Sequence, residues 1–152
     1  MKPTADLLAF FKGGEDQIQA FAQILTSKGI ERGLIGPKEG DRIWDRHIAN
    51  CLPVTTLIPQ GVRVVDIGSG AGLPGIVIAL ARPDLKMTLV EPLQRRVDFL
   101  NEVVVELNLP IEVIRGRAQS VKKQFEVVTA RAVAPLEELI KISWHMIPRG
   151  GA

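Results

Sequence analysis

The sequence predicts an α/β fold in which a parallel sheet is covered by helices and preceded by a helical region. Three observations support this. Residues 61–152 alternate between short β-branched runs and helical patterns, the first of these runs leads into a glycine-rich loop, and residues 1–60 show helical periodicity without comparable strands. Alternating strands and helices are typical of a parallel sheet, because parallel strands need a long crossover connection that is usually a helix.

The first 60 residues form the expected N-terminal helical region. Apolar side chains lie near helical spacing over residues 4–29, and Gly13–Gly14 interrupts the pattern. Residues 40–58 indicate one or two further short helices, broken near Pro53.

Residues 61–152 form the expected sheet domain. Four short apolar runs predict buried strands: "VRVVDIG", "KMTLVE", "IEVIRG" and "FEVVTARA". Helices are expected between and after them over residues 73–81, 93–108 and 135–147. In the second of these helices the expected buried face is Val97, Leu100, Val103, Val104 and Leu107, and in the third it is Leu136, Leu139, Ile140, Ser143 and Ile147.

Composition narrows the functional classes. The chain has 152 residues, 46% of them hydrophobic and 24% charged, as in a soluble domain with one core. No apolar stretch is long enough to cross a bilayer, and no signal peptide is evident, so we expect a cytoplasmic protein. Its single cysteine fits a reducing compartment, and two histidines without chelating spacing predict no metal site. A net charge of +2 permits contact with RNA without indicating it.

The glycine loop lies in the stretch "VVDIGSGAGLPGIVIAL", residues 64–80, which holds two overlapping glycine patterns. Gly70 to Gly75 is a G-x-G-x-x-G, the dinucleotide fingerprint, and Gly68 to Gly72 is a G-x-G-x-G that follows Asp66. Ligands of open parallel sheets bind beyond the carboxyl ends of the strands, which is where this loop lies. A tight turn without a ligand is the third interpretation.

Two acidic residues favour one ligand over the other. A carboxylate at the loop's entrance, Asp66, would repel the pyrophosphate of a dinucleotide. S-adenosylmethionine has no phosphate and carries an ammonium and a sulfonium, so an acid beside backbone N–H groups suits it. Glu91 ends the next strand, where an acid can accept hydrogen bonds from ribose hydroxyls, and this role fits either cofactor.

Several motifs together resemble one family. "WDRHIANC", "VVDIGSGAGLPGI", "TLVEPLQRRVDFL", "VIRGRAQ" and "VVTARAVAPLEEL" are similar to the bacterial 16S ribosomal RNA guanine-N7 methyltransferases, also called glucose-inhibited division protein B. The resemblance covers roughly residues 29–151 and is strongest to the actinobacterial branch.

The resemblance implies a Rossmann-like, class I S-adenosylmethionine-dependent methyltransferase fold. The family's sheet has strand order 3-2-1-4-5-7-6, so residues 61–152 are expected to hold only the first four strands, in the order 3-2-1-4. We therefore expect a truncated chain with impaired activity. Its fourth strand would be an exposed edge through which an oligomer could form.

The resemblance also implies site residues. Cofactor contacts are expected at Gly68, Leu73, Glu91, Ala118, Gln119 and Arg131, together with Asp66, Gly70 and Gly72 of the loop. Gln119 stands where the family usually has Glu, and its carbonyl oxygen can still accept a hydrogen bond. Arg131 would lie over the cofactor or the RNA, or form a salt bridge to Asp66 or Glu91.

The implied chemistry is positional. Guanine N7 already has a free lone pair, so its methylation needs no general base, and we assign no catalytic residue. Arg46 and His47 are candidates for RNA contact or site support, whereas Trp44 is expected in the core and Cys51 is not expected to be a nucleophile. The implied partner is 16S rRNA in the small ribosomal subunit. Three rival functions remain: an NAD-dependent oxidoreductase, a non-catalytic fragment that binds cofactor or RNA, and a methyltransferase of small molecules.

Overall fold

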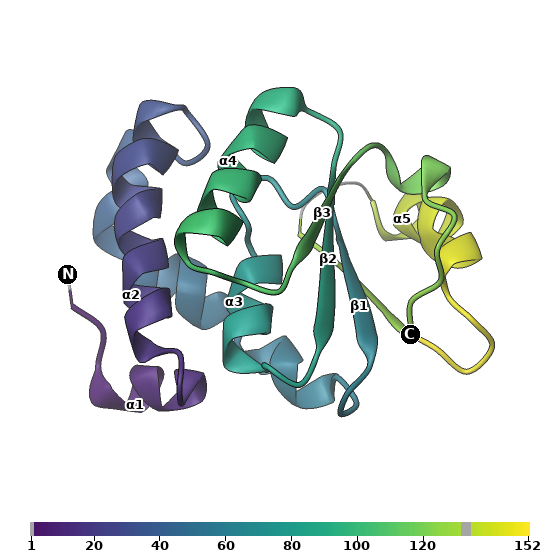
Figure 1. Ribbon diagram of the computed structural model, residues 1–152, viewed down its shortest axis with the longest axis horizontal. Helices are drawn as coiled ribbons and strands as arrows, with labels where there is room; N and C mark the ends of the chain where they lie inside the picture. The colour runs from purple at the N-terminus through teal and green to yellow at the C-terminus, as the bar shows by residue number, and fades with distance from the viewer. Residues whose placement is uncertain (1, 132–134) are drawn as a thin grey trace.

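A four-stranded parallel sheet forms the centre of the molecule (Figure 1). The computed structural model describes residues 2–131 and 135–152. The order β3-β2-β1-β4 confirms the predicted strand order. The strands are β1 (Arg63–Ile67), β2 (Lys86–Glu91), β3 (Glu112–Arg115) and β4 (Val127–Ala130).

Helices cover both faces of the sheet. Figure 1 shows α3 (Gly75–Ala81) and α4 (Gln94–Glu106) on one face and α5 (Leu136–Ser143) on the other. All three lie inside the ranges predicted from the sequence, and a 3-10 turn, Trp144–Met146, follows α5. The right-handed crossovers of a parallel sheet place helices on its two faces in this way.

The N-terminal region is helical, as predicted, and lies outside α3 and α4 (Figure 1). The chain turns at Gly13, where φ is +88°, so the predicted interruption is confirmed. The helical segments are α1 (Ala5–Leu8), a 3-10 turn (Ala9–Phe11), α2 (Glu15–Ile24) continuing into a π-helical turn (Leu25–Gly29), and the short turns Pro37–Arg42, Ile43–Ile48, Ala49–Cys51 and Pro53–Leu57.

Two hydrophobic clusters lie on the two sides of the sheet. The larger one joins side chains of the N-terminal helices, such as Phe21 and Ile48, to those of α3, α4 and the sheet, such as Ile76 and Leu89. The smaller one lies under α5 and includes Val65, Ile67, Val90, Phe125 and Met146. The N-terminal region and the sheet domain therefore share one core, and the division at residue 60 stays a prediction.

The predicted buried face of α4 is confirmed, whereas that of α5 is partly wrong. Val97, Leu100 and Val103 are buried. In α5, however, Leu136 and Ile140 are 72% and 47% exposed. Leu139 and Ser143 of the predicted face do pack inward, and Ile142, which was not predicted, packs beside them.

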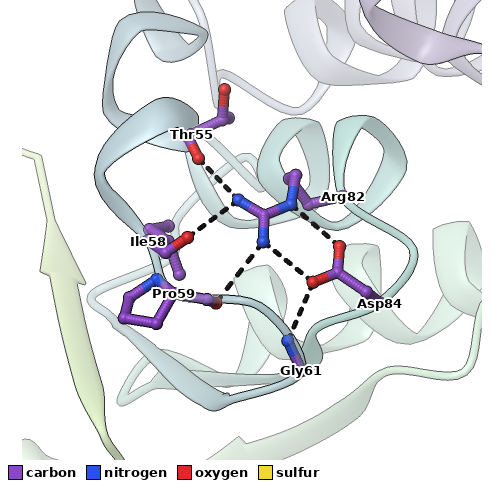
Figure 2. A network of polar contacts seen from close by, with 6 residues as sticks. All are labelled: Thr55, Ile58, Pro59, Gly61, Arg82 and Asp84. Atoms are coloured by element: carbon purple, nitrogen blue, oxygen red, sulfur yellow. Dashed lines mark hydrogen bonds and ion pairs between the residues drawn. The ribbon is translucent and has the colours of Figure 1, made fainter.

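A guanidinium network fastens the end of the N-terminal region to the sheet domain (Figure 2). Arg82 Nη1, just after α3, donates to the carbonyl oxygens of Thr55 (2.7 Å) and Ile58 (2.9 Å). The same side chain forms two 2.8 Å hydrogen bonds with Asp84, whose carboxylate also accepts from the N–H of Gly61 at 2.9 Å. Bidentate arginine–carboxylate pairs of this kind are geometrically specific.

The outer edge of β4 is partly paired. The N–H of Ala152 donates to the carbonyl of Glu126 (2.6 Å), and the N–H of Val128 donates to the carbonyl of Ala152 (2.7 Å). The last residue therefore lies alongside β4 in the parallel sense, so this edge is less exposed than predicted. Formation of an oligomer stays a prediction. Residues 132–134 of the "RAVAPL" motif lie outside the described residues.

Candidate cofactor site

The glycine loop continues from β1 across the carboxyl edge of the sheet. The N–H groups of Gly68 and Ser69 both donate to the carbonyl of Val90, at 2.8 and 3.2 Å, so the loop starts in contact with β2. Gly70 has φ +55°, a left-handed conformation that a glycine adopts without strain. This turn directs the Gly70 N–H toward the end of β2.

Glu91 accepts a hydrogen bond from that N–H group. It is 1% exposed, and its Oε1 accepts from the Gly70 N–H at 3.0 Å. Its Oε2 accepts from the Leu93 N–H at 2.9 Å, and Arg96 Nη1 lies 3.8 Å from Oε1. Each carboxylate oxygen has two lone pairs, so Glu91 is held in one orientation and can still accept from a ligand.

Asp66 lies behind the loop rather than at its entrance, which differs from the sequence expectation. It is fully buried, and its Oδ1 accepts from the Thr129 hydroxyl at 2.9 Å. Its Oδ2 accepts from the Gly75 N–H, the first of α3, at 3.2 Å. A Cβ added to Gly75 would come within 2.6 Å of that oxygen, so a glycine is required there. Asp66 therefore joins β1, β4 and α3 beneath the loop.

Burial also governs the protonation of Asp66. It raises the pKa of this carboxyl from 3.8 to about 6, against the opposing effect of the hydrogen bonds from Thr129 and Gly75. The positive charge of Arg131 lowers the pKa by a smaller amount. A carboxyl with these contacts supports the loop and has no free face toward a ligand.

A cleft of about 510 Å³ opens at the carboxyl edge of the sheet. Its lining brings together five of the residues predicted to contact a cofactor: Gly68, Glu91, Ala118, Gln119 and Arg131. Asp66, Gly70, Gly72 and Leu73 are not in this lining, and Leu73 is 5% exposed within the larger hydrophobic cluster. The cofactor contacts of all nine residues stay predictions.

A larger hollow, of about 690 Å³, lies at the opposite edge of the sheet and is lined by residues such as Arg63, Lys86 and Glu112. These residues begin β1, β2 and β3. Ligands of open parallel sheets bind at the carboxyl ends of the strands, so the smaller cleft is the candidate site.

Arg131 does not form the predicted salt bridge. Within residues 2–131 and 135–152, no carboxylate oxygen lies within 4.0 Å of its guanidinium. Glu91 is occupied instead by Arg96 and two backbone N–H groups, and Asp66 by Thr129 and Gly75. Arg131 is exposed at the cleft, and its positive charge also opposes the rise that burial causes in the pKa of Cys51 and of Asp66.

The "RHI" segment is tied to its own surroundings. His47 Nε2 lies 2.6 Å from Glu39 Oε2, and this hydrogen bond lowers the pKa of Glu39. Arg46 is exposed, and neither Arg46 nor His47 lines the cleft, so their RNA-side roles stay predictions. Trp44 is 5% exposed, which confirms its expected place in the core.

Cys51 has the environment of a structural thiol. Its Sγ donates to the carbonyl of His47 at 3.1 Å. Burial raises its pKa to about 11, so the nucleophilic thiolate is scarce near neutral pH. This agrees with the expectation that Cys51 is not a nucleophile.

Sequence analysis missed the place of Arg96 and Arg117 in the cleft. Both line it, and Arg96 also lies beside Glu91. Arg96 lies off the apolar face of α4, so helical periodicity alone gave no reason to place it at a ligand site. Its position in the first turn of a helix that starts directly after an acidic strand end was the available signal.

The described residues contain no cluster of histidine, cysteine, aspartate and glutamate that could hold a metal ion. Among the same residues, no helix has the length and apolar character needed to span a bilayer.

The strand order, the glycine loop after β1 and the buried acid that ends β2 define a class I S-adenosylmethionine-dependent methyltransferase fold. Solved structures share it. Coclaurine N-methyltransferase bound to N-methylheliamine and SAH matches with a TM-score of 0.58 at 18% identity, over 68% of this chain and 33% of that one. A SAM-dependent methyltransferase from Geobacter sulfurreducens, in complex with S-adenosyl-L-homocysteine, matches with a TM-score of 0.56 at 18% identity, over 78% and 47%.

The chain belongs to the rRNA small subunit methyltransferase G (GidB) family, whose model matches residues 14–152. Relatives named ribosomal RNA small subunit methyltransferase G include one from Acidothermus cellulolyticus, 54% identical over 86% of this chain and 60% of its own length. Another, from Kineococcus radiotolerans, is 48% identical over 98% and 60%. These matches confirm the family resemblance, and the chain spans about 60% of the length of these relatives.

Proposed function

We propose that this chain binds S-adenosylmethionine in the cleft at the carboxyl edge of the sheet. The observation that carries the proposal is Glu91, a buried carboxylate fixed by the Gly70 and Leu93 N–H groups in the wall of the cleft. A carboxylate held in one orientation at the end of the second strand suits the two hydroxyls of a ribose. The family to which the chain belongs supports a methyl donor in particular.

The neighbouring residues fit the rest of such a ligand. Ala118 and Gln119 form a short turn after β3, where they would border the adenine. Gln119 is exposed, so its side-chain amide is free to meet the exocyclic amino group. The glycine loop would approach the amino-acid part of the ligand with its backbone, as Gly68 already borders the cleft.

We further propose that the whole protein transfers the methyl group to N7 of a guanine in 16S rRNA of the small ribosomal subunit. The relatives' names support the RNA substrate. The bound cofactor would supply an electrophilic methyl group. The protein's own residues would then orient the base and exclude water, because N7 needs no deprotonation. A cytoplasmic location follows from this substrate.

Different observations support two of the rival functions, a dinucleotide-dependent enzyme and a non-catalytic fragment. The Gly70 to Gly75 pattern of a dinucleotide site is present, but family membership favours the methyl donor. Because the chain spans about 60% of the length of its relatives, binding without methyl transfer is the second candidate. Impaired turnover therefore stays a prediction.

The test is calorimetric titration of the purified chain with S-adenosylmethionine, and with NAD as the competing ligand. We expect saturable binding of S-adenosylmethionine, weakened about tenfold or more in Glu91→Gln because one charged acceptor is lost. Glu106→Gln, an exposed acid at the far end of α4, is the matched control and should bind normally. Heat with NAD alone, or none with S-adenosylmethionine from folded protein, would reject the proposal.

A further inference from the structure

Exposed arginines lie at the end of β3 and in the lining of the cleft. Arg117 and Arg131 line it, and Arg115 ends β3 two residues before Arg117. All three side chains are exposed. In the described part of the chain, no carboxylate oxygen approaches any of the three within 4.0 Å, although Glu138 also borders the cleft. We call Arg115, Arg117 and Arg131 the arginine rim.

The opposite edge of the sheet has a different charge arrangement. There Arg63 pairs with Glu126 at 3.0 Å, and Lys123 pairs with Glu112 at 2.9 Å. Such pairs largely cancel their local field. The net charge of the whole chain is only +2, so attraction of an anion depends on where the uncompensated charges lie. In this molecule Arg117 places such a charge in the lining of the cleft and Arg115 places another two residues before it, whereas the charge of Arg131, also in the lining, acts on buried Asp66 and Cys51 as well.

The backbone beneath the rim is held in place. Arg115 is in register with Glu91 across β2 and β3, and the Gly116 N–H donates to the Glu91 carbonyl at 3.0 Å. The Arg117 carbonyl accepts from both the N–H (3.0 Å) and the hydroxyl (2.8 Å) of Ser120. The exposed side chains of Arg115 and Arg117 therefore extend from fixed backbone positions, at a lower ordering cost than on a loose loop.

We propose that the arginine rim binds the RNA backbone and so brings a base to the cleft. Each guanidinium offers a planar fork of N–H donors that matches phosphate oxygens. The cleft beside the rim is the cofactor site of the proposed function, on which this inference rests. Phosphate contacts on its border would fix the register of the RNA strand, while the base itself enters the cleft.

The test is the salt dependence of RNA binding without cofactor, measured by fluorescence anisotropy with a short fluorescein-labelled single-stranded RNA that contains one guanine. We expect Arg115→Gln and Arg117→Gln each to weaken binding about tenfold at low salt. Each should also reduce the slope of log K against log salt by about 0.7, the value for one phosphate contact on a single strand. Arg117→Lys should keep the slope and lose part of the affinity, because lysine keeps the charge without the fork.

Lys86→Gln is the matched control, since it removes an exposed cation at the start of β2, on the opposite edge. Slopes unchanged in both arginine variants, an equal change in Lys86→Gln, or no RNA binding at low salt would each overturn the proposal. The result is independent of the cofactor titration. Normal S-adenosylmethionine binding with unchanged slopes rejects only the rim, and reduced slopes without S-adenosylmethionine binding reject only the cofactor site.

Discussion

At the residue scale, the two buried acids Glu91 and Asp66 have different roles at the site. Glu91 borders the cleft and is held by backbone N–H groups, whereas Asp66 lies beneath the loop and is held by Thr129 and Gly75. Both hold the glycine loop in place, but only Glu91 can meet a ligand directly. The two acids should therefore respond differently to neutralisation.

We predict that Asp66→Asn removes a pH dependence of stability. The folded pKa of about 6 lies above the ordinary value of 3.8, so the folded state binds more protons than the unfolded state between these values. The free energy of unfolding should therefore fall as pH rises from about 4 to 6, by about 3 kcal/mol for this group. The difference between wild type and Asp66→Asn in urea denaturation at pH 4 to 7 measures this term.

The neutral amide can keep both contacts, because its oxygen can accept from Gly75 and its NH₂ can donate to the Thr129 hydroxyl. Asp66→Asn should hence be at least as stable as wild type at pH 7. Asp66→Ala leaves the Gly75 N–H and the Thr129 hydroxyl without partners and should lose about 1 to 3 kcal/mol. If the asparagine variant keeps the wild-type pH dependence, the raised pKa does not belong to Asp66.

At the element scale, the strands were predictable from sequence and the side-chain networks between elements were not. Short β-branched runs place β1 and β2 within a residue or two of their observed bounds, because buried parallel strands need such runs. The face of α5 depends on which neighbour covers it, so helical periodicity assigned Leu136 and Ile140 to a buried side where they are exposed. Likewise, the "D" of "VVDIG" predicts an acid near the loop but not the direction of its carboxylate.

The Arg82 network is a second feature that sequence analysis did not detect, because its partners are backbone carbonyls about 25 residues away. The contribution of this network to the free energy of unfolding can be measured. We predict that Arg82→Ala lowers the free energy of unfolding by about 2 kcal/mol, since it leaves the carbonyls of Thr55 and Ile58 without their charged donor. The exposed pair of Arg42 and Asp45 supplies the control, and Arg42→Ala should cost about 0.5 kcal/mol or less.

The same network predicts an acid-dependent effect. The hydrogen bonds from Arg82 lower the pKa of Asp84 from 3.8 to about 2. The stability that ionised Asp84 gives the folded state is therefore fully present above pH 4 and is lost as pH falls through 2. Urea denaturation at pH 5 and pH 2.5 should show the gap between wild type and Asp84→Asn narrowing at the lower pH. A gap of constant size would mean that the pair contributes nothing through its charge.

At the scale of the whole molecule, the shared core argues that the N-terminal helices and the sheet unfold together. Phe21 of α2 is fully buried in the cluster that also contains Ile76 of α3 and Leu89 of β2. The Arg82 network adds a polar connection between the same two regions. A boundary at residue 60 would then describe the order of elements along the chain without marking two independent folding units.

We predict that Phe21→Ala destabilises both regions equally, by about 3 to 5 kcal/mol, because it opens a cavity between them. Trp44 is buried in the N-terminal region and Trp144 is 70% exposed, so a Trp144→Phe background leaves one fluorescent reporter of that region. Hydrogen exchange of the β1 and β2 amides reports on the sheet. The two probes should shift together in Phe21→Ala. A shift in Trp44 fluorescence with unchanged protection of the strands would show that the N-terminal helices unfold on their own, and that the cleft does not depend on them for its stability.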